Sequence, residues 1–522
     1  MNAGVVNVEA YTYNQGTAEE PNITPVAGGI VGWLGSGATV EIKACLNVGK
    51  IQVSEGTTGG YNPMIGLNVS GVPVIYACYA TKESCDKLDV SDIGSESVIQ
   101  VDAEAIKGSA AETVMTLLNW ETDWKCVDND FPVVNLAETT SEGVDYVATE
   151  TDTALLTALY QNRTLYQGEL HDHASNGGSS DGTVPLATWK TQMTNLGLDF
   201  AASFDHRQTW HINHSDWDKS LFIYGTEAST NISDHIGSTG DGKLHYNMIF
   251  AGQSQMQAVL NSFTEFDYET YADNENSGQQ TATNWLGRTA FGYPDFTKAR
   301  FNELIQAVKA QDGLFVLAHP MQKDTAYFSD NAMDYSFIED YVGFEVIYRF
   351  LNNGYTRENY SAWKELLAAG KRVWATSGGD GHGDLSDETL TSVYAEETAK
   401  TEGNLVSYLK DGNFTAGSVG IQMCVNGTPM GGHCDFTGQR LVVDVGEIHS
   451  SVYDSTHKYR VDVLNEDGIV YSQMLSVDET TKTATNAKIA LDVEECDFYR
   501  VEVYDVTDNY RIAYGNPIWN DK

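Results

Sequence analysis

Histidine and aspartate residues occur at two points of the sequence in pairs that are two positions apart. The first pair is His171 and His173, and the second is Asp380 and His382. In an extended backbone, residues i and i+2 point to the same face, so each pair presents both side chains to one ligand. Imidazole nitrogen and carboxylate oxygen bind divalent metal ions. Because nine of the twelve histidines lie between residues 171 and 382, this part of the chain is the candidate metal site.

Further candidate ligands lie on the loop after the first predicted strand, in the case of Asp181, or follow or lie within other predicted strands of the same region. They are Asp181, His206, Glu227, His245 and His319. Together with the two pairs they make nine donors, none of them a thiolate, which is more than one ion needs. We therefore expect a cluster of two or three divalent ions, Mn, Zn or Fe. Three more histidines lie nearby without following a strand end: His211, His214 and His235.

Residues beside these ligands are candidates for catalysis and substrate contact. Asp205 precedes His206, and we expect it either to relay a proton or to orient a metal ligand. Arg207 and Arg349 follow predicted strand ends, where a guanidinium clamps an anion through two hydrogen bonds or forms a surface salt bridge. Lys323 is a further candidate of the same kind.

The segments that must position these residues alternate between apolar, strand-like runs and amphipathic helical patterns. Predicted strands cover residues 164–170, 199–204, 221–225, 243–251, 314–318, 343–348 and 372–376. One predicted helix has Trp189 and Met193 on one face and Gly197 after its end, and two others contain Leu304 and Trp363. Seven strands alternating with helices favour a parallel α/β barrel. In such a barrel, strands one and seven are neighbours and the candidate ligands gather at the C-terminal rim.

The parts of the chain on either side of this centre have a different pattern. A length of 522 residues indicates more than one domain. Residues 1–150 predict a β-rich N-terminal domain, residues 151–418 the central domain, and residues 419–522 a small C-terminal β-sandwich. All seven cysteines lie outside the central region, so disulfides such as Cys424 with Cys434 and buried free thiols are both open alternatives.

The charge balance limits the partners of the protein. Lys and Arg number 31 against 73 Asp and Glu, which gives a formal net charge of −42. Such acidity argues against binding of nucleic acid and against docking on anionic membranes. No apolar run is long enough to predict a transmembrane helix, and residues 1–9 lack a signal-peptide pattern. We expect a small-molecule substrate and a location outside the cell or at its surface, while the oligomeric state stays open.

The motifs taken together resemble the PHP (polymerase and histidinol phosphatase) superfamily. They are GELHDH at 168–173, SDG at 180–182, LDFAASFDH at 198–206, Glu227, HYN at 245–247, AHP at 318–320 and DGH at 380–382. The resemblance covers residues 164–420 and implies a distorted seven-stranded (βα) barrel with a trinuclear metal site. By position, the ligands it implies are His171, His173, Asp181, His206, Glu227, His245, His319, Asp380 and His382. A polar insertion at 230–242 departs from the family pattern.

The C-terminal part and the overall layout carry a second resemblance. YRVEVY at 499–504 and AYGNPIW at 513–519 are similar to the β-sandwich that follows such domains in secreted members. The three-part layout resembles the CehA/McbA-type metallohydrolases. We expect a phosphoesterase in which a metal-bridging hydroxide attacks phosphorus, whereas the CehA/McbA-type layout keeps a carbonyl substrate open. Two other functions stay open, namely hydrolysis of a carboxylic ester, carbamate or amide, and non-catalytic binding at the cell surface.

Overall fold

The computed structural model divides the chain into two compact units, residues 1–143 and 144–522. The residues it describes are 6–8, 27–28, 31–34, 39–43, 45–49, 51–53, 61–62, 65–68, 72–82, 98–118, 120, 124–127, 129–134, 148–175, 182–204, 210–234, 243–266, 282–283, 289–290, 294–322, 335–508 and 510–521.

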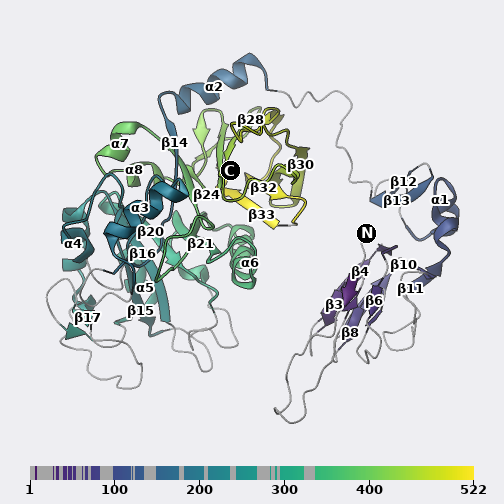
Figure 1. Ribbon diagram of the computed structural model, residues 1–522, viewed down its shortest axis with the longest axis horizontal. Helices are drawn as coiled ribbons and strands as arrows, with labels where there is room; N and C mark the ends of the chain where they lie inside the picture. Colours follow the sequence, from purple (N-terminus) through teal and green to yellow (C-terminus); the bar gives the residue numbers. More distant parts are fainter. Residues whose placement is uncertain are drawn as a thin grey trace, which may run out of the picture. The chain divides into compact units, whose positions relative to one another are not determined.

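The described part of the first unit consists mainly of short strands (Figure 1). They are β1 Val6–Val8, β2 Ala27–Gly28, β3 Val31–Leu34, β4 Thr39–Lys43, β5 Leu46–Asn47, β6 Ile51–Val53, β7 Tyr61–Asn62, β8 Ile65–Asn68, β9 Val72–Tyr76, β10 Cys78–Thr81, β11 Val98–Val101, β12 Trp124–Val127 and β13 Asp130–Val134, with helix α1 at Ala110–Val114. Most of these strands pair in parallel, as β4 does with β9. Leu46, Tyr79 and Ile106 belong to its buried core.

The second unit begins with the elements that surround the candidate ligands. They are α2 Glu150–Tyr160, β14 Thr164–Gly168, α3 Leu186–Leu196, β15 Tyr224–Ile232, β16 Lys243–Phe250, α4 Gln253–Asn261, β17 Ala282–Thr283, β18 Thr289–Ala290, β19 Asp295–Phe296, α5 Lys298–Ala310, β20 Leu314–Ala318, β21 Val342–Tyr348, α6 Gly354–Ala368, β22 Val373–Gly378, β23 Thr391–Ala395, α7 Glu397–Thr401, α8 Val406–Leu409 and β24 Phe414–Gly417. Short 3-10 turns lie in this unit at Trp210–Asn213, Thr264–Phe266 and Tyr335–Phe337, and in the first unit at Ala103–Ile106.

The amphipathic patterns correctly predicted the helices that cover the strands. α3 buries Trp189 and Met193 and ends at Gly197, whose positive φ of 73° suits glycine. α5 buries one stripe that includes Leu304, and α6 buries one that includes Trp363. α4, α5 and α6 contact strands β16, β20 and β21 respectively (Figure 1). Burial of these stripes fixes the strands from which the site residues project.

The central strands form a mixed sheet in the order β19-β15-β16-β20-β21-β22. β20, β21 and β22 are parallel, as predicted. The prediction of parallel strands throughout is wrong for β16, which runs antiparallel to both β15 and β20. Only residues 233–242 separate β15 from β16. A parallel pair needs a crossover of a dozen or more residues, so this short connection produces an antiparallel hairpin.

The fold is mixed α/β, as the sequence predicts, but the described residues form no closed barrel. β14 belongs to a different sheet, in the order β14-β23-β24-β33-β32-β29-β30. The strand predicted at 199–204 forms isolated bridges instead of a regular ladder, among them Asp172 with Ser203. Asp172 also bridges Gly381, so the segment after β14 lies between residues 202–204 and 380–381 without completing a ring of strands.

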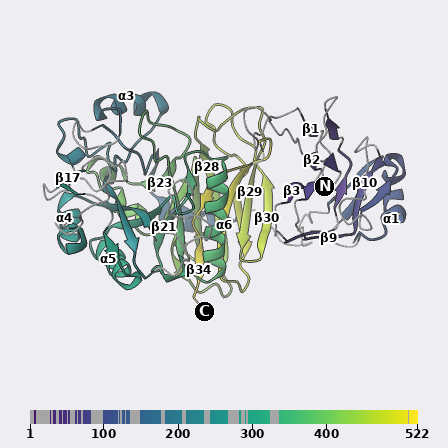
Figure 2. The same cartoon turned by 90° about the horizontal axis from the view of Figure 1, so that it is seen from below.

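The last part of the second unit consists mainly of antiparallel strands, several of which share a sheet with β14, β23 and β24. They are β25 Val419–Val425, β26 Thr428–Pro429, β27 His433–Cys434, β28 Arg440–Ile448, β29 Tyr459–Asn465, β30 Gly468–Met474, β31 Lys488–Asp492, β32 Phe498–Asp505, β33 Tyr510–Gly515 and β34 Ile518–Asn520. β24 pairs with β33, so one sheet continues across residue 419. α6 lies between the central strands and the C-terminal sheet (Figure 2), and its Tyr360 donates a hydrogen bond to Glu502 of β32.

The cysteines and the helices bear on two expectations about the cellular setting. Cys424 and Cys434 form no disulfide, and neither do the other described cysteines, Cys45, Cys78, Cys126 and Cys496. No helix among the described residues is both long enough and apolar enough to span a membrane. The extracellular or cell-surface location stays a prediction from composition.

Candidate metal centre

The segment that follows β14 carries the first histidine pair into the interior. Asp380 N donates to His171 O over 2.7 Å, and His173 N donates to Gly381 O over 2.8 Å. Between the two histidines, Asp172 Oδ1 accepts a hydrogen bond from Gly381 N at 2.7 Å. These main-chain contacts place the 171–173 pair directly beside the segment of the second pair. Both imidazoles of the first pair are fully buried.

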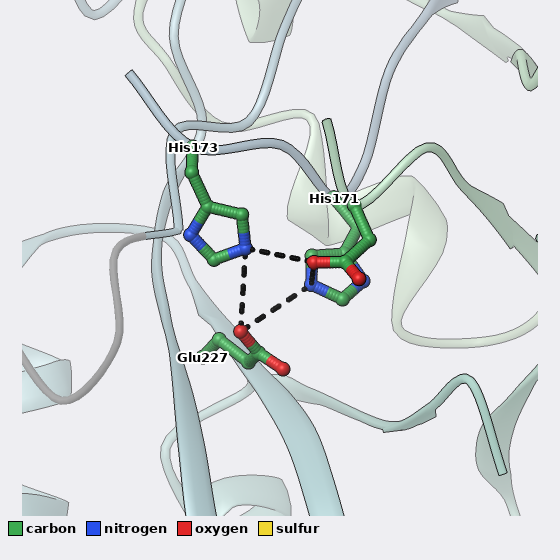
Figure 3. A group of neighbouring side chains, drawn as sticks. His171, His173 and Glu227 are labelled. Atoms are coloured by element: carbon green, nitrogen blue, oxygen red, sulfur yellow. Dashed lines mark hydrogen bonds and ion pairs between the residues drawn. The ribbon is translucent and has the colours of Figure 1, made fainter. Parts of the chain in front are cut away.

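Four of the predicted ligands converge on one point, which we call the first donor group. Its members are His171, His173, Glu227 and Asp380. His173 Nε2 lies 3.3 Å from Glu227 Oε2 and 3.1 Å from Asp380 Oδ1. His171 Nε2 lies 3.6 Å from Glu227 Oε2 and 3.7 Å from Asp380 Oδ1. Figure 3 shows both imidazoles turned toward the Glu227 carboxylate.

The other oxygen of Glu227 faces a second donor group, which consists of Glu227, His245 and His319. Glu227 Oε1 lies 2.7 Å from His245 Nδ1 and 3.3 Å from His319 Nε2. The residues come from neighbouring strands, because β15 carries Glu227, β16 carries His245, and His319 follows β20. Glu227 is fully buried and thus presents one oxygen to each group.

The spacing of the donor atoms fits divalent metal ions. Two ligands about 2.1 Å from a tetrahedral ion lie about 3.4 Å apart, and the four contacts of the first donor group span 3.1 to 3.7 Å. His171 Nε2 is buried and makes no hydrogen bond, although it faces two carboxylates. A buried polar atom without a hydrogen bond is costly unless another group completes its environment. The donor set therefore suits a cation of the Zn, Mn or Fe type.

The electrostatics of the metal-free site also favour positive charge. Burial lowers the pKa of His173, but its contacts with Asp380 and Glu227 outweigh this and raise it to about 10. Burial also lowers the pKa of His171, while the carboxylates of Glu345 and Glu227 raise it well above its usual value. Burial raises the pKa of Asp380, but His173 and the other nearby imidazoles bring it well below its usual range. In the metal-free site, protons on the histidines supply positive charge, and a bound divalent ion would take the place of these protons.

Two residues that the sequence did not single out contact the ligands directly, and a third carries a buried carboxylate. Glu345 Oε1 lies 2.9 Å from His171 Nδ1, and its Oε2 accepts from His319 N at 2.6 Å. The Tyr348 hydroxyl donates to Asp380 Oδ2 over 2.7 Å. Glu169 is fully buried, and burial raises its pKa well above its usual value. The one available signal was a charged residue inside an apolar strand, which applies to Glu345 in β21.

Two further predicted site residues lie beside the first donor group without belonging to it. The His382 ring stacks on His173 with centroids 4.4 Å apart, and His382 Nδ1 lies 3.0 Å from Asp380 O. Arg349 Nη2 lies 4.0 Å from Asp380 Oδ2, and 42% of the Arg349 side chain is exposed. Arg349 is thus placed to reach both the first donor group and solvent.

A non-glycine residue with a positive φ angle follows each of the three parallel strands. His319, Arg349 and Asp380 follow β20, β21 and β22 closely and have φ angles of 29°, 63° and 50°. Positive φ costs of order 1–3 kcal/mol for a residue other than glycine and persists only where surrounding contacts enforce it. Two of the three residues belong to the donor groups, which locates the site at this edge of the sheet.

The remaining predicted residues fall into two sets. Outside the described residues lie Asp181, Asp205, His206, Arg207, His235 and Lys323. His211 is described and buried, with Nε2 3.1 Å from Gly225 O. His214 Nδ1 accepts from Asp216 N at 3.2 Å. Neither His211 nor His214 belongs to the donor groups found among the described residues.

A third set of neighbouring donors lies in the C-terminal sheet and has a structural explanation. It consists of His457, Asp505 and Asp508. Asp505 Oδ1 accepts from the main-chain N–H of Thr507 and of Asp508, and its Oδ2 lies 2.7 Å from His457 Nδ1. Both oxygens of the buried carboxylate therefore have partners that stabilise the turn after β32.

Comparisons with known proteins add little to this geometry. No family model matches the chain. No curated protein matches it. Among solved structures, one similar chain is an amidohydrolase from Chromobacterium violaceum with bound sulfate and no metal. The identity is 16%, the TM-score is 0.26, and the match covers 42% of this chain and 89% of that chain. This likeness is too distant to carry an argument about the site.

Proposed function

We propose that this protein is a metal-dependent hydrolase, and that its substrates are small phosphoesters. The observation that carries the proposal is the position of Glu227 between two donor groups, one facing each of its oxygens. A carboxylate placed in this way suits a pair of divalent ions, which activate water for attack and neutralise charge on the substrate when bound.

Two sets of described residues, which share Glu227, would hold the two ions. His171, His173 and Asp380 would hold one ion, while His245 and His319 would hold the other, with Glu227 shared between them. A third ion, which the PHP resemblance implies, would draw on His382 and on residues outside the described part. We propose Mn, Zn or Fe because the donors are imidazole and carboxylate.

The position of Arg349 supports an anionic substrate. Its guanidinium lies near Asp380 at the edge of the first donor group and is partly exposed, so it is placed to form two hydrogen bonds to a phosphoryl group. Because the whole chain carries a net charge of −42, a small or capped phosphoester approaches more easily than a long polyanion. Roles for Asp205 and Arg207 stay predictions.

The test combines metal analysis with a substrate panel. The chelator-treated protein receives Mn²⁺ or Zn²⁺ and is assayed with nitrophenyl phosphate, bis-nitrophenyl phosphate and nitrophenyl acetate. We expect metal-dependent hydrolysis of at least one phosphoester and its loss in His171→Ala and His173→Ala. His433→Ala is the matched control, because His433 is half-exposed and pairs with Asp521 on the C-terminal side.

Three outcomes would contradict the proposal in different ways. Undiminished hydrolysis in His171→Ala would remove the site assignment. Metal-dependent hydrolysis of the acetate alone would refute the phosphoester part. A folded wild-type protein that binds no ion and hydrolyses no member of the panel would refute the hydrolase itself and favour a binding protein.

A further inference from the structure

One carboxylate that belongs to neither donor group, that of Glu345, contacts a residue of each. Glu345 lies in β21, where all seven residues are buried, and its side chain is 1% exposed. The register between β21 and β22 shifts between Glu345 and Ile347, which marks a β-bulge. Bulges of this kind re-aim side chains next to functional sites. Here the bulge occurs at the only charged residue of an otherwise uncharged strand.

The two oxygens of Glu345 contact different donor groups. Oε1 lies 2.9 Å from His171 Nδ1, which belongs to the first donor group. Oε2 accepts a hydrogen bond from the main-chain N–H of His319, at 2.6 Å, in the second donor group. A carboxylate only accepts hydrogen bonds, so His171 Nδ1 carries the proton and Nε2 is left to face Glu227 and Asp380.

The surrounding backbone leaves room for this carboxylate and little else. A Cβ atom at Gly378 would lie 2.1 Å from Glu345 Oε1 and 2.5 Å from the Cβ of His171. Glu345 Oε2 accepts its hydrogen bond from the main-chain N–H of His319, whose φ angle of 29° is strained. The hydrogen bond from this N–H therefore helps to hold a conformation that the backbone alone disfavours.

We propose that Glu345 is a positioning residue that fixes the tautomer of His171 and the backbone of His319 together, and so supports ion binding at both donor groups. This inference rests on the proposed function, since it requires that the donor groups bind metal. No conservative replacement performs both tasks. In glutamine, one oxygen accepts, but the amide NH₂ then faces an N–H donor. Aspartate is shorter by one methylene group.

The test is the metal affinity of Glu345→Gln, measured by chelator competition on the full chain with Zn²⁺ or Mn²⁺. We expect both the first and the second ion to bind about 10–100-fold more weakly, the usual effect of losing such a partner. Asp462→Asn is the matched control, because Asp462 is also a buried carboxylate that accepts from Arg460 and Ser472 but lies on β29, outside both donor groups. The control should bind both ions with unchanged affinity.

The outcomes separate this inference from the proposed function. If the wild type binds no ion, the proposed function fails. If the wild type binds metal and Glu345→Gln binds both ions equally well, Glu345 has no positioning role. A loss confined to one ion contradicts a role for Glu345 at both donor groups.

A second measurement does not depend on whether Glu345→Gln folds. In the zinc-loaded wild type labelled with ¹⁵N-histidine, the signals of His171 are assigned by their absence in His171→Gln. We expect a protonated Nδ1 and a metal-bound Nε2. A protonated Nε2 would overturn the proposal.

Discussion

Raising the pH of the metal-free protein should lower its free energy of unfolding, because His173 then loses its proton inside the folded site. The pKa of His173 is about 10 in the folded protein and 6.5 for an ordinary histidine. A group whose pKa is raised by folding contributes stability that is complete below its unfolded pKa. That stability is lost as the pH rises through the folded pKa. The window for His173 is therefore pH 6.5 to about 10.

The size of the effect follows from the same values. Each pKa unit corresponds to about 1.4 kcal/mol, so His173 accounts for about 5 kcal/mol across this window. That is comparable to the whole stability of a weakly stable domain, about 5–15 kcal/mol. His171 acts in the same direction, since its pKa is also raised. Asp380, with a lowered pKa, loses its contribution only at acid pH and stays constant here.

The assay is urea unfolding followed by circular dichroism at pH 6, 7, 8, 9 and 10 in the presence of chelator. Other groups titrate at the upper end of this range, so the quantity to examine is the difference between wild type and His173→Asn. We expect this difference to shrink by several kcal/mol between pH 6 and 10. Saturating Zn²⁺ should remove the contribution of His173 to the decline in the wild type, because metal-bound imidazoles are already neutral.

One result would refute this reasoning. If the wild type and His173→Asn have parallel stability curves between pH 6.5 and 10, His173 carries no proton in the metal-free site. The interpretation of the first donor group as a cavity for positive charge would then be wrong.

Four other predictions test separate parts of the site and the fold. Glu227→Gln should weaken binding of both ions, whereas His319→Ala should weaken chiefly one, as measured by metal content after dialysis; equal losses in both variants would argue against a shared carboxylate. Arg349→Ala should raise KM for a phosphoester about tenfold, the value of one charge-assisted hydrogen bond, with a smaller change in kcat and partial recovery in Arg349→Lys. Removing metal should lower the thermal midpoint, since an ion at 100 times its Kd adds about 3 kcal/mol. Glu502→Gln should lower the free energy of unfolding by about 3 kcal/mol, because Arg500 loses its buried partner, and leave metal content unchanged.

The candidate metal ligands could be predicted from the sequence because their spacing and their positions relative to strands are local features. The i and i+2 spacing of His171 and His173 places both on one face of an extended segment, whatever surrounds it. The helices could also be predicted from the sequence, since α5 and α6 each carry one apolar stripe. Glu227, His245 and His319 were found because they follow or lie within predicted strands.

The direction of β16 could not be found from its own residues. Its apolar pattern is the same for a parallel or an antiparallel neighbour, and the short connection after β15 decides between them. The register of β21 could not be predicted either, because the register shift at Glu345 depends on how β21 pairs with β22. Glu345 therefore appeared in the sequence only as a charged residue within an apolar run.

The sequence by itself determined which side chains are available for metal chemistry and which helices and strands carry them, because donor type, spacing and hydrophobic period are properties of short segments. Only the tertiary structure decided that each of the two oxygens of Glu227 faces a different donor group. It alone also decided that Glu345 contacts one residue of each group. Both facts depend on distances between residues far apart in the chain, such as 171 and 345. Such distances are set by strand order, register and packing, which no local pattern specifies.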